Sequence, residues 1–558
     1  DKHWSSYSTQ QLIDEVRFVA LGLYEIGVRS GEMIGLLAAP SSEWVIIDLA
    51  IMSSGAVTVP LFANISDENF LFEVMQTEMK TVIVSGKEQW DMYSKHGYHF
   101  NKIITFDVET CDKCISYKSL LLRGKQLDAE KPTLYSEITG KVSPDTLATI
   151  IYTSGTGGIP KGVELTHFNI VSLFDFEGFN WDPPTDSYLS ILPLAHVFGR
   201  CFNLLMICWG ISVYYLNDIK GMSAQCAEIH PTILVVVPRL LEKMYAKMLA
   251  KVEHAGGMKR PLGLWAFELA NQEQDSFYKT LMHPIADKIV YSALRSALGS
   301  KVRILISGGA ALNPHLCHFF IHVGIPVFEG WGLTEASTVC VNTLKHRKVG
   351  SVGQPIRRNE VKTSAENELL VRAPIVMRGY YKNPEYSAKV LDSEGWLHTG
   401  DKGYIDKDGF VFIQGRLKEM LKTSTGEYIA PVPIEQALCK VPLIDMALVV
   451  GDNRKFASCL LFPDQEVLNS LRTLHGAQDM PFEKFVNGEF ITGEIKNLLN
   501  NLNMNLNHWE QLHNFRIVLA PLTVESGDLT PSMKIRREII TKKYSDLINE
   551  MYAEEKND

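Results

Sequence analysis

The sequence predicts an α/β protein of two or more domains, and three observations lead to this prediction. The chain has 558 residues, more than one hydrophobic core usually organises. Hydrophobic residues make up 46% of it, yet no apolar run reaches ~18 residues, so no membrane-spanning helix is expected. Short apolar stretches of strand type alternate with amphipathic stretches of helix type. Such alternation is typical of a parallel sheet covered by helices.

The first hundred residues show this alternation most clearly. Residues 8–26 predict an amphipathic helix, because Ser8 and Gln11 resemble a capping box and Gly27 ends the apolar pattern. The elements expected next are strands at 33–38, 57–60 and 81–84 and helices at 42–53 and 68–78. Residues 106–145 are polar and predict an irregular segment without a motif.

The rest of the chain continues the pattern with longer helical segments. Further strands are expected at 188–192, 211–216, 232–237, 326–328 and 410–414, with helical sequence at 239–298. The last part of the chain predicts a compact α+β unit, with strands at 446–450 and 457–462 and helices at 481–502 and 535–550. A smaller C-terminal domain therefore follows the α/β part.

The charge balance and the cysteines exclude several classes of protein. Asp and Glu number 64 against 55 Lys and Arg, and the net charge of −9 disfavours a nucleic-acid binder, which normally has a basic face. Of nine scattered cysteines, Cys111 and Cys114 form the one C-x-x-C pair, so we expect free thiols in a reducing cytosol. No basic-then-apolar leader precedes Ser8, which argues against a signal peptide. We expect a cytoplasmic protein.

A loop rich in hydroxyls and glycines follows the strand-forming run 148–152. It reads Thr153-Ser154-Gly155-Thr156-Gly157-Gly158-Ile159-Pro160-Lys161-Gly162. Small residues let main-chain N–H groups approach a phosphate chain, the hydroxyls add donors, and Lys161 adds a positive charge. The nucleoside-triphosphatase P-loop is excluded, because Gly162 follows Lys161 where that loop has Ser or Thr. A Gly-rich linker is the alternative, but linkers seldom follow a buried-type strand.

Two further stretches carry groups suited to a nucleotide. These are Ser307-Gly308-Gly309-Ala310 and Glu329-Gly330-Trp331-Gly332-Leu333-Thr334-Glu335, each after a predicted strand. The Trp331 ring offers a flat face for adenine, and Gly330 and Gly332 let the backbone approach the base. Thr334 can donate to an α-phosphate, and Glu335 supplies a hard oxygen for Mg²⁺. The alternative is an exposed turn with an accidental Trp.

Four other polar residues have ordinary structural explanations when each is taken alone. His196 follows a predicted strand and can be a core histidine satisfied by one hydrogen bond. Asp401 follows Gly400 in a predicted tight turn, where a carboxylate is usually structural. Lys534 near a helix start is normally a solvated surface charge. Arg416, after the strand at 410–414, can bond a ribose or a phosphate.

In this order, the motifs resemble those of the adenylate-forming enzymes, the superfamily of acyl-CoA synthetases, luciferases and peptide-synthetase adenylation domains. The likeness extends from about residue 8 to 545, and Leu194-Ala195-His196 and the helical stretch 239–298 are similar to the long-chain fatty-acid branch. It implies a large N-terminal domain, residues 1–417, of two sheet-and-helix subdomains and a β-rich one. It also implies a small mobile α+β lid domain, residues 418–558.

The resemblance implies a role for each motif residue. Lys534, Thr334, Glu335 and His196 become catalytic, and Glu335 and Thr156 become Mg²⁺ ligands. The implied nucleotide and thiol contacts are Thr153, Ser154, Gly155, Thr156, Gly157, Gly158, Lys161, Gly309, Ala310, Gly330, Trp331, Gly332, Asp401, Arg416 and Gly426. Lys418 occupies the hinge position. The family more often has Ser or Thr in place of Gly157 and Tyr in place of Trp331. The tryptophan that gates the acyl tunnel in bacterial members is here absent or replaced by Arg200.

The implied reaction is the ATP-dependent ligation of a long-chain fatty acid to CoA through an acyl-adenylate, with release of AMP and pyrophosphate. Its co-substrates are ATP and CoA, and its metal is Mg²⁺. On the same fold, a medium-chain or aryl acid, or acyl carrier protein or oxygen as acceptor, is the alternative. A non-catalytic acyl or nucleotide sensor is the alternative of another class. Membrane contact is expected to be peripheral at most, and a monomer and a homodimer both stay open.

Overall fold

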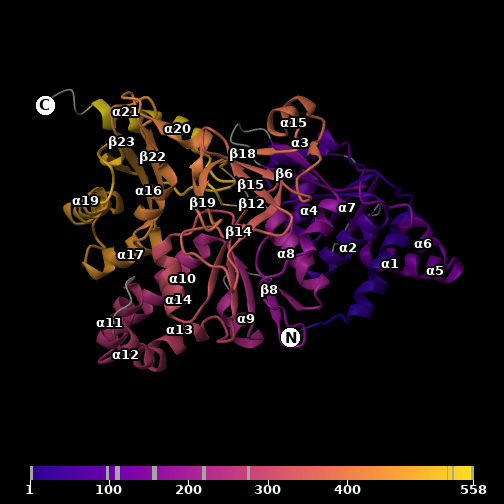
Figure 1. The fold of residues 1–558 in the computed structure, drawn as a ribbon, viewed down its shortest axis with the longest axis horizontal. Helices are drawn as coiled ribbons and strands as arrows, with labels where there is room; N and C mark the ends of the chain where they lie inside the picture. The colour runs from indigo at the N-terminus through magenta and orange to yellow at the C-terminus, as the bar shows by residue number, and fades with distance from the viewer. Residues whose placement is uncertain are drawn as a thin grey trace.

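The computed structural model describes residues 4–63, 65–95, 98, 100–106, 114–153, 160–216, 221–272, 277–524, 526–530 and 533–553. Figure 1 shows a large body that carries the N-terminus and a smaller body, orange to yellow, that carries the C-terminus. Within these ranges the strands form an eight-stranded, a seven-stranded, a four-stranded, a two-stranded and a three-stranded sheet. The fold is α/β, as the sequence predicts.

The first sheet is the one that the N-terminal alternation predicts. Its order is β17-β7-β6-β2-β1-β3-β4-β5, and the strands from β6 to β5 run parallel. The strands are β1 (Met33–Leu37), β2 (Val57–Leu61), β3 (Thr81–Val84), β4 (Lys102–Thr105), β5 (Cys114–Ser116), β6 (Leu147–Thr153), β7 (Lys161–Thr166) and β17 (Gly379–Tyr380). Its helices include α1 (Thr9–Glu25), α2 (Ser42–Ser53), α3 (Asp67–Thr77) and α4 (Gly86–Lys95). The predicted capping box of α1 is present on Ser8 and Gln11.

The prediction of an irregular segment at 106–145 is wrong. Besides β5, this segment contains the helices α5 (Tyr117–Glu130) and α6 (Leu134–Thr139). Helix α5 is largely polar, and it packs on α1 through close backbone contact instead of a broad apolar face. A Cβ on Gly124 would lie 1.7 Å from the Phe18 carbonyl oxygen, and one on Gly22 would lie 2.3 Å from the Leu120 carbonyl oxygen. Glycine is therefore required at both positions, and apolar periodicity does not reveal the helix.

The second sheet has the order β14-β13-β12-β11-β10-β8-β9, with β9 to β12 parallel. Its strands are β8 (Ser187–Ser190), β9 (Ser212–Tyr215), β10 (Ile233–Val236), β11 (Ile304–Ser307), β12 (Val327–Leu333), β13 (Ser337–Val341) and β14 (Gln354–Pro355). Helix α7 (His167–Val171) packs on β7 of the first sheet. The helices of the second sheet are α8 (Val197–Cys208), α9 (Met222–Ile229), α10 (Pro238–Glu253), α11 (Lys259–Asn271), α12 (Phe277–Ala286), α13 (Ser292–Ser296) and α14 (Pro314–His322), with a π-helical turn at Asp287–Tyr291.

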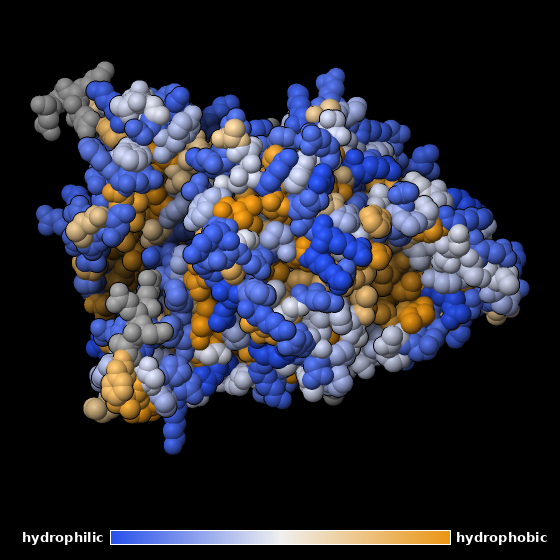
Figure 2. All heavy atoms as spheres, viewed as in Figure 1, coloured by the Kyte–Doolittle hydropathy of each residue, from blue (hydrophilic) through white to orange (hydrophobic). Residues whose placement is uncertain are grey.

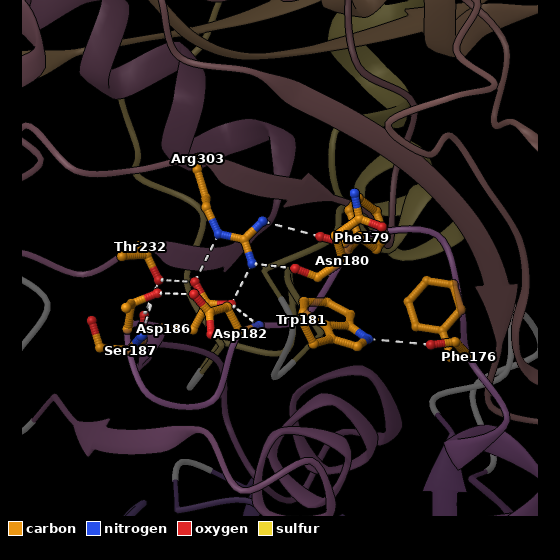
Figure 3. A network of polar contacts seen from close by, with 10 residues as sticks. Phe176, Phe179, Asn180, Trp181, Asp182, Asp186, Ser187, Thr232 and Arg303 are labelled. Carbon is orange, nitrogen blue, oxygen red and sulfur yellow. Dashed lines mark hydrogen bonds and ion pairs between the residues drawn. The ribbon is translucent and has the colours of Figure 1, made fainter.

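A buried carboxylate fixes the amino ends of β8, β10 and β11 (Figure 3). Asp186, 3% exposed, accepts hydrogen bonds from Arg303 Nε at 2.7 Å and from Thr232 Oγ1 at 2.8 Å. Arg303 also donates to the Phe179 carbonyl oxygen at 3.0 Å. Burial raises the pKa of Asp186, but the hydrogen bonds, above all those from Arg303, outweigh it and lower the pKa overall. The candidate site residues follow the opposite, carboxyl ends of these strands.

The β-rich part follows the second sheet. Its strands β15 (Glu360–Thr363), β16 (Glu368–Arg372), β18 (Leu397–Ile405) and β19 (Val411–Arg416) form the antiparallel order β15-β16-β18-β19, and α15 (Pro384–Val390) lies between β17 and β18 in sequence. The C-terminal part contains β20 (Leu421–Lys422), β21 (Tyr428–Ile429), α16 (Pro431–Leu438), β22 (Ile444–Val450), β23 (Ala457–Pro463), α17 (Gln465–Leu474), α18 (Phe482–Val486), α19 (Glu489–Asn503), β24 (Leu512–Ile517), α20 (Arg537–Lys543) and α21 (Ser545–Ala553). The helix expected at 535–550 is thus two helices.

The surface is mostly hydrophilic, with apolar patches between the charged residues (Figure 2). One patch belongs to α12 and the turn after it, where Phe277, Leu281, Ile285 and Ile289 are exposed. Within the described ranges, no helix is long and apolar enough to cross a membrane. The cysteines described there all have free thiols; Cys111 of the C-x-x-C pair lies outside them.

Candidate active site

The phosphate loop joins two antiparallel strands. Thr153, the last residue of β6, is the register partner of Lys161, the first residue of β7, and its hydroxyl lies 3.5 Å from the Lys161 carbonyl oxygen. A P-loop joins a strand to a helix, so the exclusion of that motif agrees with the fold. Thr153 and Lys161 are thus brought together. Ser154, Gly155, Thr156, Gly157 and Gly158 lie outside the described residues.

Glu335 lies in the turn between β12 and β13, where Thr334 precedes it. Its Oε1 accepts a hydrogen bond of 2.6 Å from the Tyr380 hydroxyl, and its backbone carbonyl accepts the Met377 N–H at 2.7 Å. These bonds hold the carboxylate toward the β7 and β17 side of the first sheet, which carries Lys161. Nothing in the sequence pattern pairs Tyr380 with Glu335; the Met377 bond to the Glu335 carbonyl, just before β17, joins the two segments.

Trp331 and Asp401 form a buried pair that the sequence does not predict. The Trp331 Nε1 donates to Asp401 Oδ2 at 2.9 Å, and Arg416 Nε lies 2.8 Å from Asp401 Oδ1. Burial raises the pKa of Asp401, while Arg416 and then the Trp331 bond act to lower it. The expectation of a tight turn at Asp401 is wrong, and the exposed turn considered as the alternative for Trp331 is also ruled out. Trp331 lies within β12, and Asp401 lies within β18 beside Gly400, whose φ is +71°. The two strands thus place both side chains within hydrogen-bonding distance of each other.

The tryptophan ring is only 8% exposed, because it packs in the core between the second sheet and the β-rich part. This burial limits the area that adenine can cover. Gly332 lies at a bulge, where a Cβ would come within 1.6 Å of the Ser337 carbonyl oxygen. Gly330 has more room, since its Cβ would meet the Cys340 carbonyl oxygen at 3.3 Å. The glycines therefore allow the β12–β13 turn to close, with Glu335 within it.

His196 caps the amino end of α8. Its Nδ1 accepts the Phe198 N–H at 3.2 Å, so the neutral ring carries its proton on Nε2. Burial, together with the Lys534 charge, lowers the pKa of His196 to about 4. The ring is thus a neutral donor at physiological pH. Phe198 packs on the turn after β11, where a Cβ on Gly308 would lie 2.9 Å from its ring.

Lys534 comes from the C-terminal part and reaches the same place. It lies in a tight loop, where its N–H donates to Thr530 Oγ1 at 3.1 Å. Its side chain is open to solvent but interacts electrostatically with Arg416, Asp401 and His196. Although the residue is exposed, the protein groups around its ammonium partly desolvate it and lower the pKa of Lys534, and Arg416 lowers it further. The charge of Lys534 is therefore felt at Asp401, Arg416 and His196.

Polar contacts between described residues of the two parts hold the C-terminal part in this orientation. Arg239 of α10 forms an ion pair with Asp445 of β22. Gln436 Nε2 of α16 donates to the Ala311 carbonyl oxygen at 2.5 Å, next to the Gly309-Ala310 turn. Gly309 has a φ of +83°, which favours glycine at this turn.

The remaining predicted residues lie around the junction of the two parts. Lys418 occupies a 3-10 turn (Leu417–Glu419) directly after β19. Gly426, with a φ of +93°, lies between β20 and β21, and a Cβ there would meet nothing within 4 Å. Arg200 does not gate a tunnel: it is 2% exposed, and its guanidinium binds the buried Asp48 carboxylate at 2.8 and 2.5 Å. The suggestion of an Arg200 gate is wrong, because the side chain is occupied in the core.

Sequence reasoning missed Glu329, a buried acid two residues before Trp331. Its carboxylate accepts the Gly350 N–H at 3.3 Å, and burial raises the pKa of Glu329 to about 7. An acid that directly follows the predicted strand 326–328 and opens the nucleotide motif was the available signal. No group of three or more His, Cys, Asp or Glu side chains suited to a metal occurs in the described ranges. A single carboxylate such as that of Glu335 is enough for Mg²⁺, which usually takes one or two protein carboxylates plus substrate phosphates.

Comparison with known proteins finds relatives along the whole chain. The AMP-binding enzyme family matches residues 1–381, and the AMP-binding enzyme C-terminal domain matches residues 418–556. A long-chain-fatty-acid–CoA ligase of Mycobacterium bovis is 30% identical over 571 residues, covering 100% of this chain and 94% of the relative. Human long-chain-fatty-acid–CoA ligase 6 is 28% identical and covers 99% of this chain and 82% of the relative.

Solved structures show the same fold. The adenylation domain of the carboxylate reductase from Mycobacterium chelonae superposes with a TM-score of 0.76 at 21% identity, covering 99% of this chain and 85% of that one. The likeness spans both the sheet-bearing part and the C-terminal part that carries Lys534. Since the family match alone covers more than half of the sequence and the relatives align from end to end, the chain belongs to the AMP-binding enzyme family.

Proposed function

We propose that this protein is a long-chain fatty-acid–CoA ligase, which uses ATP to form an acyl-adenylate and then transfers the acyl group to CoA. One observation carries the proposal: Lys534 from the C-terminal part interacts electrostatically with Asp401, Arg416 and His196 of the large part. The relatives that match end to end are named as long-chain-fatty-acid–CoA ligases, which supports the acid and the acceptor.

The first half-reaction needs charge stabilisation and positioning but no protein nucleophile. A fatty carboxylate attacks the α-phosphorus of ATP, the bond to pyrophosphate breaks, and negative charge develops on the phosphate oxygens. Lys534 and Thr334 act on the α-phosphate, and Lys161 acts on the departing phosphates. Asp401 accepts from the ribose hydroxyls while Arg416 and Trp331 fix its orientation. The neutral His196 donates from Nε2 without adding a charge.

Glu335 would hold Mg²⁺ through the oxygen that Tyr380 leaves available. The metal, when bound, neutralises phosphate charge. The hydrogen bond from the Tyr380 hydroxyl fixes the orientation of the carboxylate.

The second half-reaction requires that Lys534 leave the site. The CoA thiol attacks the acyl carbonyl, forms the thioester and displaces AMP. We infer that the C-terminal part, residues 418–558, is a lid that rotates about Lys418 between the two steps. Rotation brings the β20–β21 hairpin with Gly426 toward the thiol path.

The substitution Lys534→Ala should then slow acyl-adenylate formation about a hundredfold or more, a loss of ~3 kcal/mol, while thioester formation from supplied acyl-adenylate survives.

A panel of C2 to C20 acids in an ATP-dependent CoA ligation assay tests the substrate. Each buried methylene contributes about 0.8 kcal/mol, so catalytic efficiency should rise with chain length until the acyl site is full. We expect an optimum between roughly C12 and C18, given that increment per methylene. Faster turnover of acetate than palmitate would refute the long-chain assignment. Transfer to acyl carrier protein but not CoA would refute the acceptor, and no pyrophosphate release with any acid would refute catalysis. Peripheral membrane contact stays a prediction, and both a monomer and a homodimer stay open.

A further inference from the structure

Two lysines with different predicted roles meet on one tyrosine ring. Tyr386 lies in α15, and no sequence motif singles it out. The Lys161 ammonium lies 3.5 Å from its ring centroid, and the Lys418 ammonium lies 6.0 Å from the same centroid. One lysine ends the phosphate loop, and the other occupies the hinge position.

The ring is held in place by its neighbours. The Tyr386 N–H donates to the side chain of Asn383, the residue that caps α15, at 3.2 Å. The ring meets Tyr380 edge to face, with centroids 5.3 Å apart and an interplanar angle of 64°. The Tyr380 hydroxyl in turn donates to Glu335. A continuous set of contacts thus runs from Lys161 through Tyr386 and Tyr380 to Glu335.

The electrostatics favour a cation on this ring. The negative face of an aromatic ring attracts an ammonium group, more strongly where water is partly excluded. A hydrogen bond of Lys161 with the Tyr386 hydroxyl is the largest cause that lowers the pKa of Tyr386; burial opposes it, and the charges of both lysines act in the same direction as that bond. The ammonium therefore contacts both the ring and its hydroxyl. Tyr386 is half-buried, so an apolar side chain of similar size could fill its place in the core but could not hold the ammonium.

We propose that Tyr386 is a positioning residue for the adenylation half-reaction: its ring holds the Lys161 ammonium beside the phosphate loop and links it to the hinge lysine Lys418. The proposal rests on the proposed function. Lys161 would otherwise sample many rotamers, and the ring restricts it before the triphosphate binds. Rotation of the lid about Lys418 would break one of the two contacts, so the link exists in the orientation that carries Lys534 into the site.

Steady-state ATP–pyrophosphate exchange with palmitate tests the ring. The substitution Tyr386→Leu removes the aromatic face, and we expect the KM for ATP to rise roughly three- to tenfold, the range of one cation–π contact. Tyr386→Phe keeps the aromatic face and removes only the hydroxyl, so its KM for ATP should lie between those of the wild type and the Leu variant. Tyr386→Met, which also lacks a ring, should match Leu and replaces it if the Leu variant does not fold. The KM for palmitate should not change.

Tyr24 provides a matched control. The Arg29 guanidinium lies 3.9 Å from its ring centroid on α1, in the first sheet's helical layer, and Tyr24→Leu should leave both KM values unchanged. In a Lys161→Ala background, Tyr386→Leu should add nothing, because the ring acts through that lysine. Thioester formation from supplied acyl-adenylate should proceed at the wild-type rate in every Tyr386 variant.

Several results would overturn the assignment. These are a wild-type KM for ATP in the Leu and Met variants, an additive effect with Lys161→Ala, a Phe variant as impaired as Leu, or equal loss in both half-reactions. They leave the proposed function standing if the wild type exchanges with palmitate. If the wild type catalyses no exchange with any fatty acid tested, the proposed function is overturned first, and this inference falls with it.

Discussion

At the residue scale, the indole N–H of Trp331 is bound to a carboxylate. Trp331→Phe would keep the packing and remove the donor to Asp401, which is 5% exposed. A hydrogen bond to a charged group contributes about 1.5–3 kcal/mol, so ATP affinity should fall at least tenfold. Trp331→Ala should also lower the stability, since truncating a buried aromatic ring typically costs ~3–5 kcal/mol. Calorimetric ATP titration and thermal unfolding measure the two effects. Wild-type ATP affinity in the Phe variant would show that stacking alone matters.

Glu329 predicts a pH dependence of stability. Its folded pKa of about 7 is above the ordinary value of 4.5, so between these pH values the folded state binds more protons than the unfolded state. The contribution of Glu329 is therefore fully present below pH 4.5 and is lost as the pH rises through 7. Near it lies Cys317, whose pKa is raised by burial and then by Glu329, while Arg347 acts to lower the pKa of Cys317.

The test compares Glu329→Gln with the wild type by urea unfolding at pH 5 and pH 8. Glutamine keeps an acceptor for the Gly350 N–H but cannot ionise. The two proteins should be similarly stable at pH 5, and the variant should be the more stable at pH 8, by about 1.4 kcal/mol for each unit of raised pKa. A constant difference across this range would mean that the carboxyl does not titrate there.

At the element scale, the Asp48–Arg200 pair joins α2 to α8, the helix that His196 caps. Arg200 Nη1 also donates to Thr149 Oγ1 of β6 at 2.7 Å, so three elements meet at one guanidinium. Arg200→Ala would leave Asp48, which is 0% exposed, without its countercharge, and should reduce the free energy of unfolding by about 3–5 kcal/mol. The double variant Asp48→Leu, Arg200→Met removes both charges and should recover most of that loss. Denaturant unfolding measures both, and equal losses would show that packing dominates.

At the scale of the whole molecule, the Arg239–Asp445 pair ties the large part to the C-terminal part. Both side chains are about a third exposed, so the pair contributes no more than about 1 kcal/mol. Arg239→Ala should slow acyl-adenylate formation two- to fivefold, the range of an exposed pair, by releasing this orientation. Thioester formation from supplied acyl-adenylate should not slow.

The matched control is Arg372→Ala, which breaks the exposed pair of Arg372 with Glu360 at 2.8 Å inside the β-rich part. It should leave both half-reactions unchanged. Small-angle scattering of Arg239→Ala should show a broader distribution of shapes than the wild type. Equal slowing of both half-reactions by Arg239→Ala would contradict a role in lid orientation.

The sequence by itself determined the elements whose signals are local. The capping box of Ser8 and Gln11, the bounds of α2 and the alternation that gives a parallel sheet all depend on neighbours a few residues away. The order of the nucleotide motifs could be read for the same reason, because each glycine and hydroxyl acts within its own loop. Helix α5 was missed because its packing on α1 depends on glycines and not on an apolar face.

Only the tertiary structure decided which side chains share the site. Trp331 meets Asp401 because β12 and β18 belong to adjoining sheets, and Lys161 meets Tyr386 because β17 pairs with β7. These partners are far apart in the chain, and neither periodicity nor capping carries information about them. The same holds for the placement of Lys534 beside Arg416. Local sequence patterns indicated which residues belong to the site. Long-range strand pairing and the docking of the C-terminal part determined which of them contact one another.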